Sequence, residues 1–189
     1  MFENIPAQSG QIYEYLSKGN FLTANTTNKE NRNLYGVVED NFELLRDYFM
    51  GINFILEQGD GYFYFARKES RSSLEQKLLR LFSWIDIMDF FTTYDASFGP
   101  GFVFSPAEIL VRSRIDMDLE MKLDGLKKHA GGKEKRKEIL DSILDRMVKD
   151  GYIECVSDIN GSWKVLSSWN YLTSIIDCIN FENEDEIPE

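Results

Sequence analysis

Histidine, the side chain most often used for acid–base catalysis, occurs only once in this chain of 189 residues, at position 129. His129 stands in a lysine-rich stretch, without the partners that a catalytic triad or a multi-histidine metal site needs. We interpret it as a solvated surface side chain. The sequence therefore predicts neither a histidine-based active site nor a histidine metal centre.

Carboxylates and glycines also offer little chemistry. Asp116, Asp118 and Glu120 are close enough in sequence for a hard-cation site, but their spacing matches no complete calcium loop. Acids in the first turn of a helix interact favourably with its dipole, so we favour a structural role. Residues 99–101 (GPG) lack the pattern of a phosphate-binding loop and are interpreted as a linker. No nucleophile–base pair stands out, and we expect a protein that is not an enzyme and uses no metal or cofactor.

Residues 127–137 (KKHAGGKEKRK) form a basic segment with six lysines and arginines against one acid. The whole chain has 32 acidic and 21 basic residues and a net charge of −11, which excludes a protein that coats nucleic acid by bulk charge. The segment covers a turn and the start of a helix that can approach DNA in helix-turn-helix proteins, where lysines contact phosphates without reading bases. A solvated loop that simply carries charge is the alternative. The candidate DNA-contact residues are Lys127, Lys128, Lys133, Lys135, Arg136 and Lys137.

The elements that position this segment follow a repeated order, an apolar-periodic helix and then a hairpin. In the first half, Val38, Phe42, Leu45 and Phe49 are spaced by four, three and four, which places them on one helical face. Two β-prone runs around the turn sequence at 58–61 follow and predict a hairpin.

In the second half, an apolar stripe from Ile139 to Val148 ends at Asp150-Gly151, a helix C-terminal signal. Residues 152–156 and 162–166 then bracket Asn160-Gly161, a strong hairpin signal. Two such units predict a mainly helical α+β fold, with tandem winged-helix domains whose wings are small antiparallel β-hairpins.

The expected boundaries are an N-terminal winged-helix domain at 1–98, a C-terminal one at 99–180 and a disordered acidic tail at 181–189. Capping-box patterns at 72–75 and 105–108 predict two helix starts. The first opens a long connecting helix at about 72–94, which is apolar most of the way round and must be covered on more than one side. Either the second unit or a second copy of the chain covers it, and the candidate interface residues are Trp84, Ile87 and Phe91.

The cellular compartment follows from what the sequence lacks. No apolar run approaches the ~20 residues of a membrane-spanning helix, and residues 1–10 lack the features of a secretion signal. Cys155 and Cys178 are too few for a disulfide framework, and we interpret them as small packing residues. We expect a cytoplasmic, nucleoid-associated protein with no membrane contact.

The tandem order, the acidic balance and three phrases resemble the MukE/MksE family of kite proteins, tandem winged-helix subunits of bacterial condensins. The phrases are residues 12–19 (IYEYLSKG), 62–67 (YFYFAR) and 84–91 (WIDIMDFF). The resemblance implies a non-catalytic homodimer that binds a MukF/MksF-like kleisin and, through it, a MukB/MksB-like ATPase, in chromosome organisation and segregation or in defence against plasmids. The local positive charge of residues 127–137 on this acidic chain predicts weak, non-specific DNA contact that matters inside the assembled complex. A dimeric winged-helix transcription regulator that binds a specific operator is the alternative function.

Overall fold

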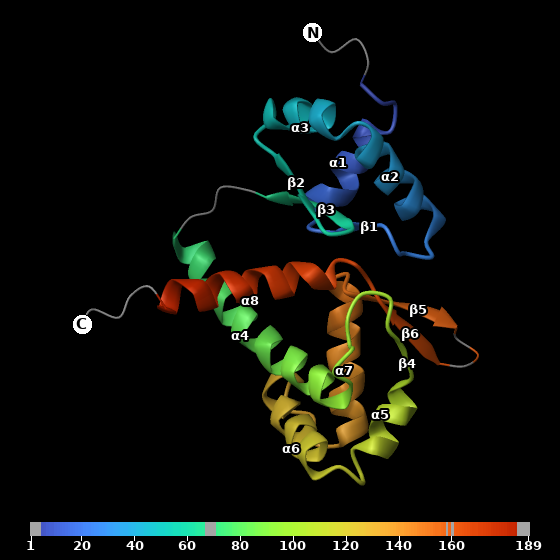
Figure 1. Cartoon of the computed structure of the whole chain (residues 1–189), viewed down its shortest axis with the longest axis vertical. Helices are drawn as coiled ribbons and strands as arrows, with labels where there is room; N and C mark the ends of the chain where they lie inside the picture. The colour runs from blue at the N-terminus through green and yellow to red at the C-terminus, as the bar shows by residue number, and fades with distance from the viewer. Residues whose placement is uncertain (1–4, 67–70, 158, 160, 185–189) are drawn as a thin grey trace.

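The computed structural model describes residues 5–66, 71–157, 159 and 161–184. Figure 1 shows two halves, one above the other, each with its own small sheet. Both sheets have three antiparallel strands among the described residues. The coarse prediction of a mainly helical α+β fold is therefore confirmed.

The first half consists of α1 (Ser9–Ser17), β1 (Leu22–Thr23), α2 (Lys29–Asp40), α3 (Phe42–Met50), β2 (Ile55–Gly59) and β3 (Tyr62–Ala66). The strand order is β1-β3-β2. The predicted hairpin is confirmed, because Glu57 pairs with Tyr64 and Gly59 with Tyr62. Gly61 lies in the turn with a φ of 74°, a conformation that glycine adopts without strain.

The apolar stripe from Val38 to Phe49 does not lie on one continuous helix. Asn41 has a φ of −130° and separates α2 from α3. Its side-chain Nδ2 donates to the Val37 carbonyl at 2.9 Å, and its backbone N–H donates to the Val38 carbonyl. Asparagine side chains compete in this way with helical hydrogen bonds, which the apolar spacing did not reveal.

The second half repeats the order of the first with additions. It consists of α4 (Arg71–Tyr94), β4 (Val103–Phe104), α5 (Pro106–Arg112), α6 (Met117–Gly125), the 3₁₀ helix η1 (Leu126–His129), α7 (Arg136–Lys149), β5 (Ile153–Ser157), β6 (Ser162–Val165) and α8 (Trp169–Glu184). The strand order, β4-β6-β5, corresponds to that of the first sheet. The second predicted hairpin is confirmed, since Ile153 pairs with Val165 and Cys155 with Trp163.

Two hydrophobic clusters fill the two halves. The first core lies between α1, α2, α3 and the first sheet and contains Ile12, Leu16, Leu22, Leu34, Val38, Leu45, Phe49, Leu56 and Phe63. The second core gathers side chains from α4 through α8. The part of α4 with described side chains, from Arg80 onward, thus packs with the second half and not with the first.

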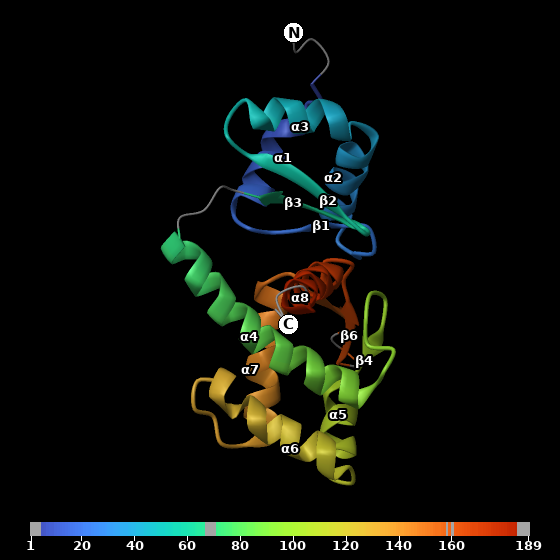
Figure 2. The ribbon, with the colours of Figure 1, turned by 60° about the vertical axis from the view of Figure 1, so that its left-hand side comes forward.

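The halves also contact each other. Figure 2 shows the first sheet between α1–α3 on one side and α8 on the other. Tyr171 of α8 packs against Tyr62 and Tyr64 of β3, with ring centroids 6.2 and 5.0 Å away. Phe21, which precedes β1, contacts Tyr152 and Tyr171 of the second half.

Helix starts and ends correct several local predictions. Helix α5 begins at Pro106 after Ser105, as predicted, but the Ser105 side chain makes no capping hydrogen bond, so no capping box forms. The side chains of the other predicted box, at 72–75, lie outside the described residues. Helix α8 continues to Glu184, so the first part of the predicted disordered tail is helical, while 185–189 lie outside the described residues.

Two further observations concern the cysteines and the membrane. Cys155 is exposed on β5, so its interpretation as a packing residue is wrong; the Cys178 side chain lies outside the described residues. Within the described part of the chain, no helix combines the length and apolar character that crossing a bilayer requires.

Candidate nucleic-acid interface

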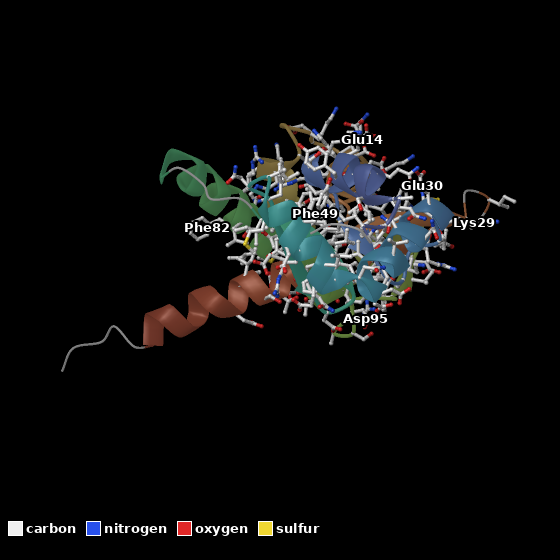
Figure 3. The ribbon with its side chains drawn as sticks, turned by 90° about the horizontal axis from the view of Figure 1, so that it is seen from above. Glu14, Lys29, Glu30, Phe49, Phe82 and Asp95 are labelled. Atoms are coloured by element: carbon white, nitrogen blue, oxygen red, sulfur yellow. The ribbon has the colours of Figure 1, made fainter. Side chains whose placement is uncertain are left out.

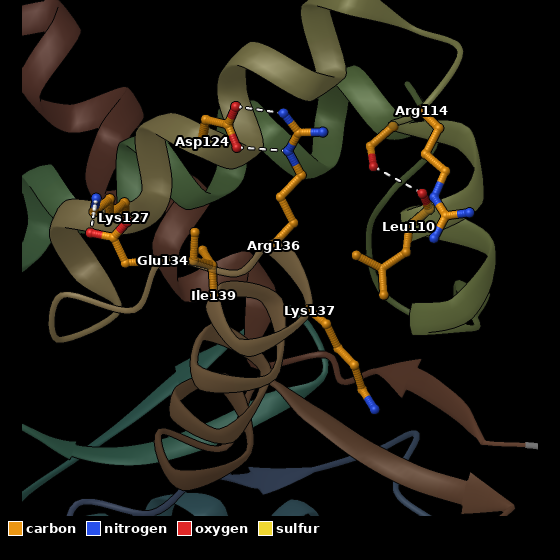
Figure 4. A pocket seen from close by; sticks show the side chains of 9 residues that line it. Leu110, Arg114, Asp124, Lys127, Glu134, Arg136, Lys137 and Ile139 are labelled. Carbon is orange, nitrogen blue, oxygen red and sulfur yellow. Dashed lines mark hydrogen bonds and ion pairs between the residues drawn. The ribbon is translucent and has the colours of Figure 1, made fainter.

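The basic segment 127–137 runs along η1, through a glycine turn and into the first turn of α7. Gly131 and Gly132 have φ values of 64° and 78°, so the turn needs two successive residues in the left-handed region. Helix α7 is anchored by its buried apolar face, which is Ile139, Leu140, Ile143, Leu144 and Met147. The start of α7 lies beside α6, and Figure 4 shows Arg136 next to Asp124 of that helix.

Arg136 is committed to two acids of α6. Its Nε and Nη2 donate to the two carboxylate oxygens of Asp124 at 2.8 and 2.9 Å, a bidentate pair drawn in Figure 4. Its Nη1 also pairs with Glu120. The hydrogen bond from Arg136 holds the pKa of Asp124 below its ordinary value. Arg136 thus joins α7 to α6, and Glu120 forms an ion pair with it. Asp116 caps α6 by accepting from the backbone N–H groups of Asp118 and Leu119.

Three lysines of the segment also pair with acids. Lys127 contacts Glu134 at 2.6 Å, Lys128 contacts Asp86 of α4 at 2.7 Å, and Lys135 contacts Glu138 at 3.3 Å; these are Nζ-to-carboxylate distances. Exposed ion pairs of this kind add little stability, but they offset the positive field of the segment.

His129 differs from its predicted surface role. Its side chain is only 16% exposed, and its Nε2 lies 2.6 Å from Asp86 Oδ2. Burial raises the pKa of Asp86, but hydrogen bonds from Lys128 and His129 outweigh it and leave that pKa below its ordinary value. His129 and Lys128 therefore tie η1 to α4, a contact between residues 43 positions apart that local sequence does not show.

Lys133 and Lys137 are the two predicted contacts that form no ion pair with a described residue. Lys137 lines a hollow of about 720 Å³ whose walls also include Leu110, Ser113, Arg114, Asp124, Lys127, Glu134, Arg136 and Ile139. Sequence reasoning missed Arg114, which reaches the hollow from the loop after α5. The nearby pair Arg112 and Arg114 was the available signal.

The charge in this hollow decides what it can bind. Asp124 and Glu134 lie opposite Arg136 and Lys127, with which they pair. Arg114 and Lys137 then remain as cations without a carboxylate partner among the described residues. Contacts from such groups to phosphate oxygens rest on charge and carry no base information.

The predicted interface residues lie elsewhere. Trp84 is 4% exposed, and Ile87 and Phe91 are fully buried in the second core. Phe91 stacks on Phe98 with ring centroids 4.5 Å apart, and the Arg146 guanidinium lies over the Trp84 ring. The sequence left open whether the second unit or a second copy of the chain covers these side chains. In the structure, the second half of the same chain covers them.

Comparison with known proteins gives one family. No curated protein matches the chain. A family model described as condensin complex protein MksE matches residues 7–176, which include both cores and the basic segment. The chain belongs to the MksE family of condensin complex proteins.

Proposed function

We propose that the chain is a non-catalytic, kleisin-binding subunit of a bacterial condensin-like complex, with a role in chromosome organisation and segregation or in plasmid defence. The family match over residues 7–176 carries this proposal. In the proposal the direct partner is a MukF/MksF-like kleisin, and a MukB/MksB-like ATPase is reached through it. ATP hydrolysis belongs to that ATPase and needs no catalytic residue here.

Each half is, in this proposal, a winged-helix unit. The repeated order of helix, strand, helices and a strand pair, with the last strand central in each sheet, supports it. We place the boundary between the units before α4 and not at 98/99, because α4 occupies in the second half the position that α1 has in the first. Residues 84–98 also contribute to the second core.

Partner binding needs accessible apolar surface. Ile115, Met117 and Met121 are 84%, 77% and 70% exposed, and together with Val111 they follow one another along the end of α5 and the start of α6. Exposed apolar residues grouped in this way are typical of protein–protein contacts. A homodimer remains part of the proposal, with contacts other than Trp84, Ile87 and Phe91.

The DNA contact in this proposal is weak, independent of sequence and important only in the assembled complex. Pairing of Lys127, Lys128, Lys135 and Arg136 with acids supports this, because it leaves Lys133 and Lys137 of the segment without an ion-pair partner among the described residues, on a chain of net charge −11. The same pairing is unfavourable for the alternative, a regulator that binds an operator by itself.

Co-expression with a MukF/MksF-like kleisin from the same organism tests the proposal. We expect the two proteins to co-purify at low and moderate salt, and the double variant Met117→Glu/Met121→Glu to lose the kleisin. Ile159→Glu, which changes a still more exposed apolar residue in the β5–β6 turn, is the control and should retain it. Absence of co-purification with the unmodified chain would reject kleisin binding.

A further inference from the structure

The loop between β1 and α2, residues 24–28, lies against the second sheet although it belongs to the first half. It carries several hydrogen bonds between the halves, and Asn170 of α8 makes a separate one to Asp60. Three of its residues, Asn25, Thr26 and Thr27, hydrogen-bond to residues 154–167 of the second half. These contacts join segments about 130 positions apart in sequence.

Glu154 of β5 is the centre of this contact. Its carboxylate accepts hydrogen bonds from the Thr26 hydroxyl at 2.7 Å, from the Thr27 backbone N–H at 2.8 Å and from the Lys164 ammonium at 2.9 Å. The side chains of Glu154 and Lys164 are each only 15% exposed. A partly buried carboxylate is stable as an anion only with such partners, so Glu154 depends on the loop being in place.

Asn25 completes the contact with both ends of its side-chain amide. Its Nδ2 donates to the Val165 carbonyl at 2.9 Å, and its Oδ1 accepts from the Ser167 N–H at 2.8 Å. The Asn25 carbonyl also accepts from Lys164, which therefore bridges Glu154 and the loop. These bonds are directional and fix one arrangement of loop and sheet.

The loop is equally tied to α2 of its own half. Asn28 caps α2 by accepting from the Asn31 N–H, and the Arg32 guanidinium donates to the Thr26 carbonyl. The Thr26 hydroxyl accepts from the Asn28 N–H while donating to Glu154. Thr26 thus connects the start of α2 directly to β5 of the other half.

We propose that residues 24–28 act as a polar latch, held by the Glu154–Lys164 pair, which sets the orientation of the two halves and whose release lets them move apart without unfolding. Each half has its own hydrophobic core, so neither core depends on the latch. The halves also meet through aromatic rings, so release of the latch lets them part only where the contacts of Tyr171 and Phe21 separate as well. Relative motion of domains is the ordinary expectation unless their interface is large and hydrophobic. While the latch is closed, a partner that contacts both halves binds them in one fixed relative orientation.

Hydrogen–deuterium exchange of the full chain tests the latch. In Glu154→Gln we expect exchange at residues 22–28 and 162–168 to rise at least tenfold, while residues 139–147 of α7 and 42–50 of α3 keep wild-type rates. Glu138→Gln, which breaks an exposed ion pair with Lys135, is the matched control and should change neither set.

A second variant keeps the test informative if Glu154→Gln folds poorly. Thr26→Val removes one hydroxyl donor and retains the ion pair, and it should raise exchange in the same two segments by a smaller factor. Small-angle scattering should show a larger radius of gyration for Glu154→Gln. An increase in hydrogen exchange that is spread through both cores in both variants, or no increase in either variant, would refute the latch proposal. Neither measurement depends on the kleisin.

Discussion

Replacement of Phe91 by alanine tests how α4 is integrated into the fold. Phe91 is fully buried, and its ring lies within 4.5–6.5 Å of the rings of Phe90, Phe98, Phe104 and Trp169. Removal of a buried phenylalanine side chain loses its transfer free energy and leaves a cavity, at a cost of about 3–5 kcal/mol. In a chain of this size each kcal/mol lowers the melting temperature by about 2–4 °C, so we expect a decrease of roughly 6–20 °C.

Phe82 supplies the matched control, because it is the same residue type on the same helix. It is 61% exposed, and Figure 3 shows it projecting from α4 outside the packed body. Phe82→Ala should therefore change the unfolding free energy by less than about 0.5 kcal/mol, the range of ordinary surface substitutions.

Thermal and urea unfolding of both variants, followed by circular dichroism at several protein concentrations, gives the result. Since Phe91 packs within one chain, its loss should cost the same at every concentration. If a second copy covered Phe91 instead, the apparent cost would vary with concentration. Equal stability of Phe91→Ala and Phe82→Ala would refute the assignment of α4 to the second core.

Two further predictions concern charge. The triple variant Arg114→Glu/Lys133→Glu/Lys137→Glu should weaken DNA binding by the assembled complex. It should also lower the dependence of log affinity on log salt by about 1 for each phosphate that is no longer neutralised. Lys128→Gln should have little effect, and salt titrations with unrelated DNA sequences measure both results. Burial raises the pKa of Glu154, but hydrogen bonds from its partners lower it more, so the folded-state pKa is below the unfolded-state value of about 4.3. The contribution of Glu154 to folding stability is therefore complete above about 4.3 and is lost as the pH falls through the folded-state pKa. The difference in unfolding free energy between wild type and Glu154→Gln, from urea titrations, should be constant above about pH 5 and shrink below about pH 4.

Local signals predicted the hairpins well. Gly61 and Gly161 have φ values of 74° and 58°, as such turns require, and the paired strands adjoin them in sequence; Asn160 of the predicted signal lies outside the described residues. Strands β1 and β4 were missed because each has two residues and pairs with a strand about 40 to 60 positions away. Such short strands have no periodicity of their own and depend on the sheet already present.

The candidate site was predicted in its location but not in its charge. The basic segment stands beside α7 as expected, yet the acids that pair with it come from α4 and α6 as well as from its own sequence. A count of charges within one sequence segment leaves out acids from other helices that the fold places beside that segment. The same reason explains His129, whose partner Asp86 is on another helix, and Arg114, which reaches the hollow from a separate loop.

Isolation of the tagged chain from its native cells at moderate salt, with identification of the proteins bound to it, tests the central claim most directly. We expect a kleisin and an ATPase of the structural-maintenance-of-chromosomes class to be recovered together, and the ATPase to be absent when the kleisin is deleted. Recovery of the chain without either protein, or bound by itself to one defined operator, would contradict its role as a condensin subunit.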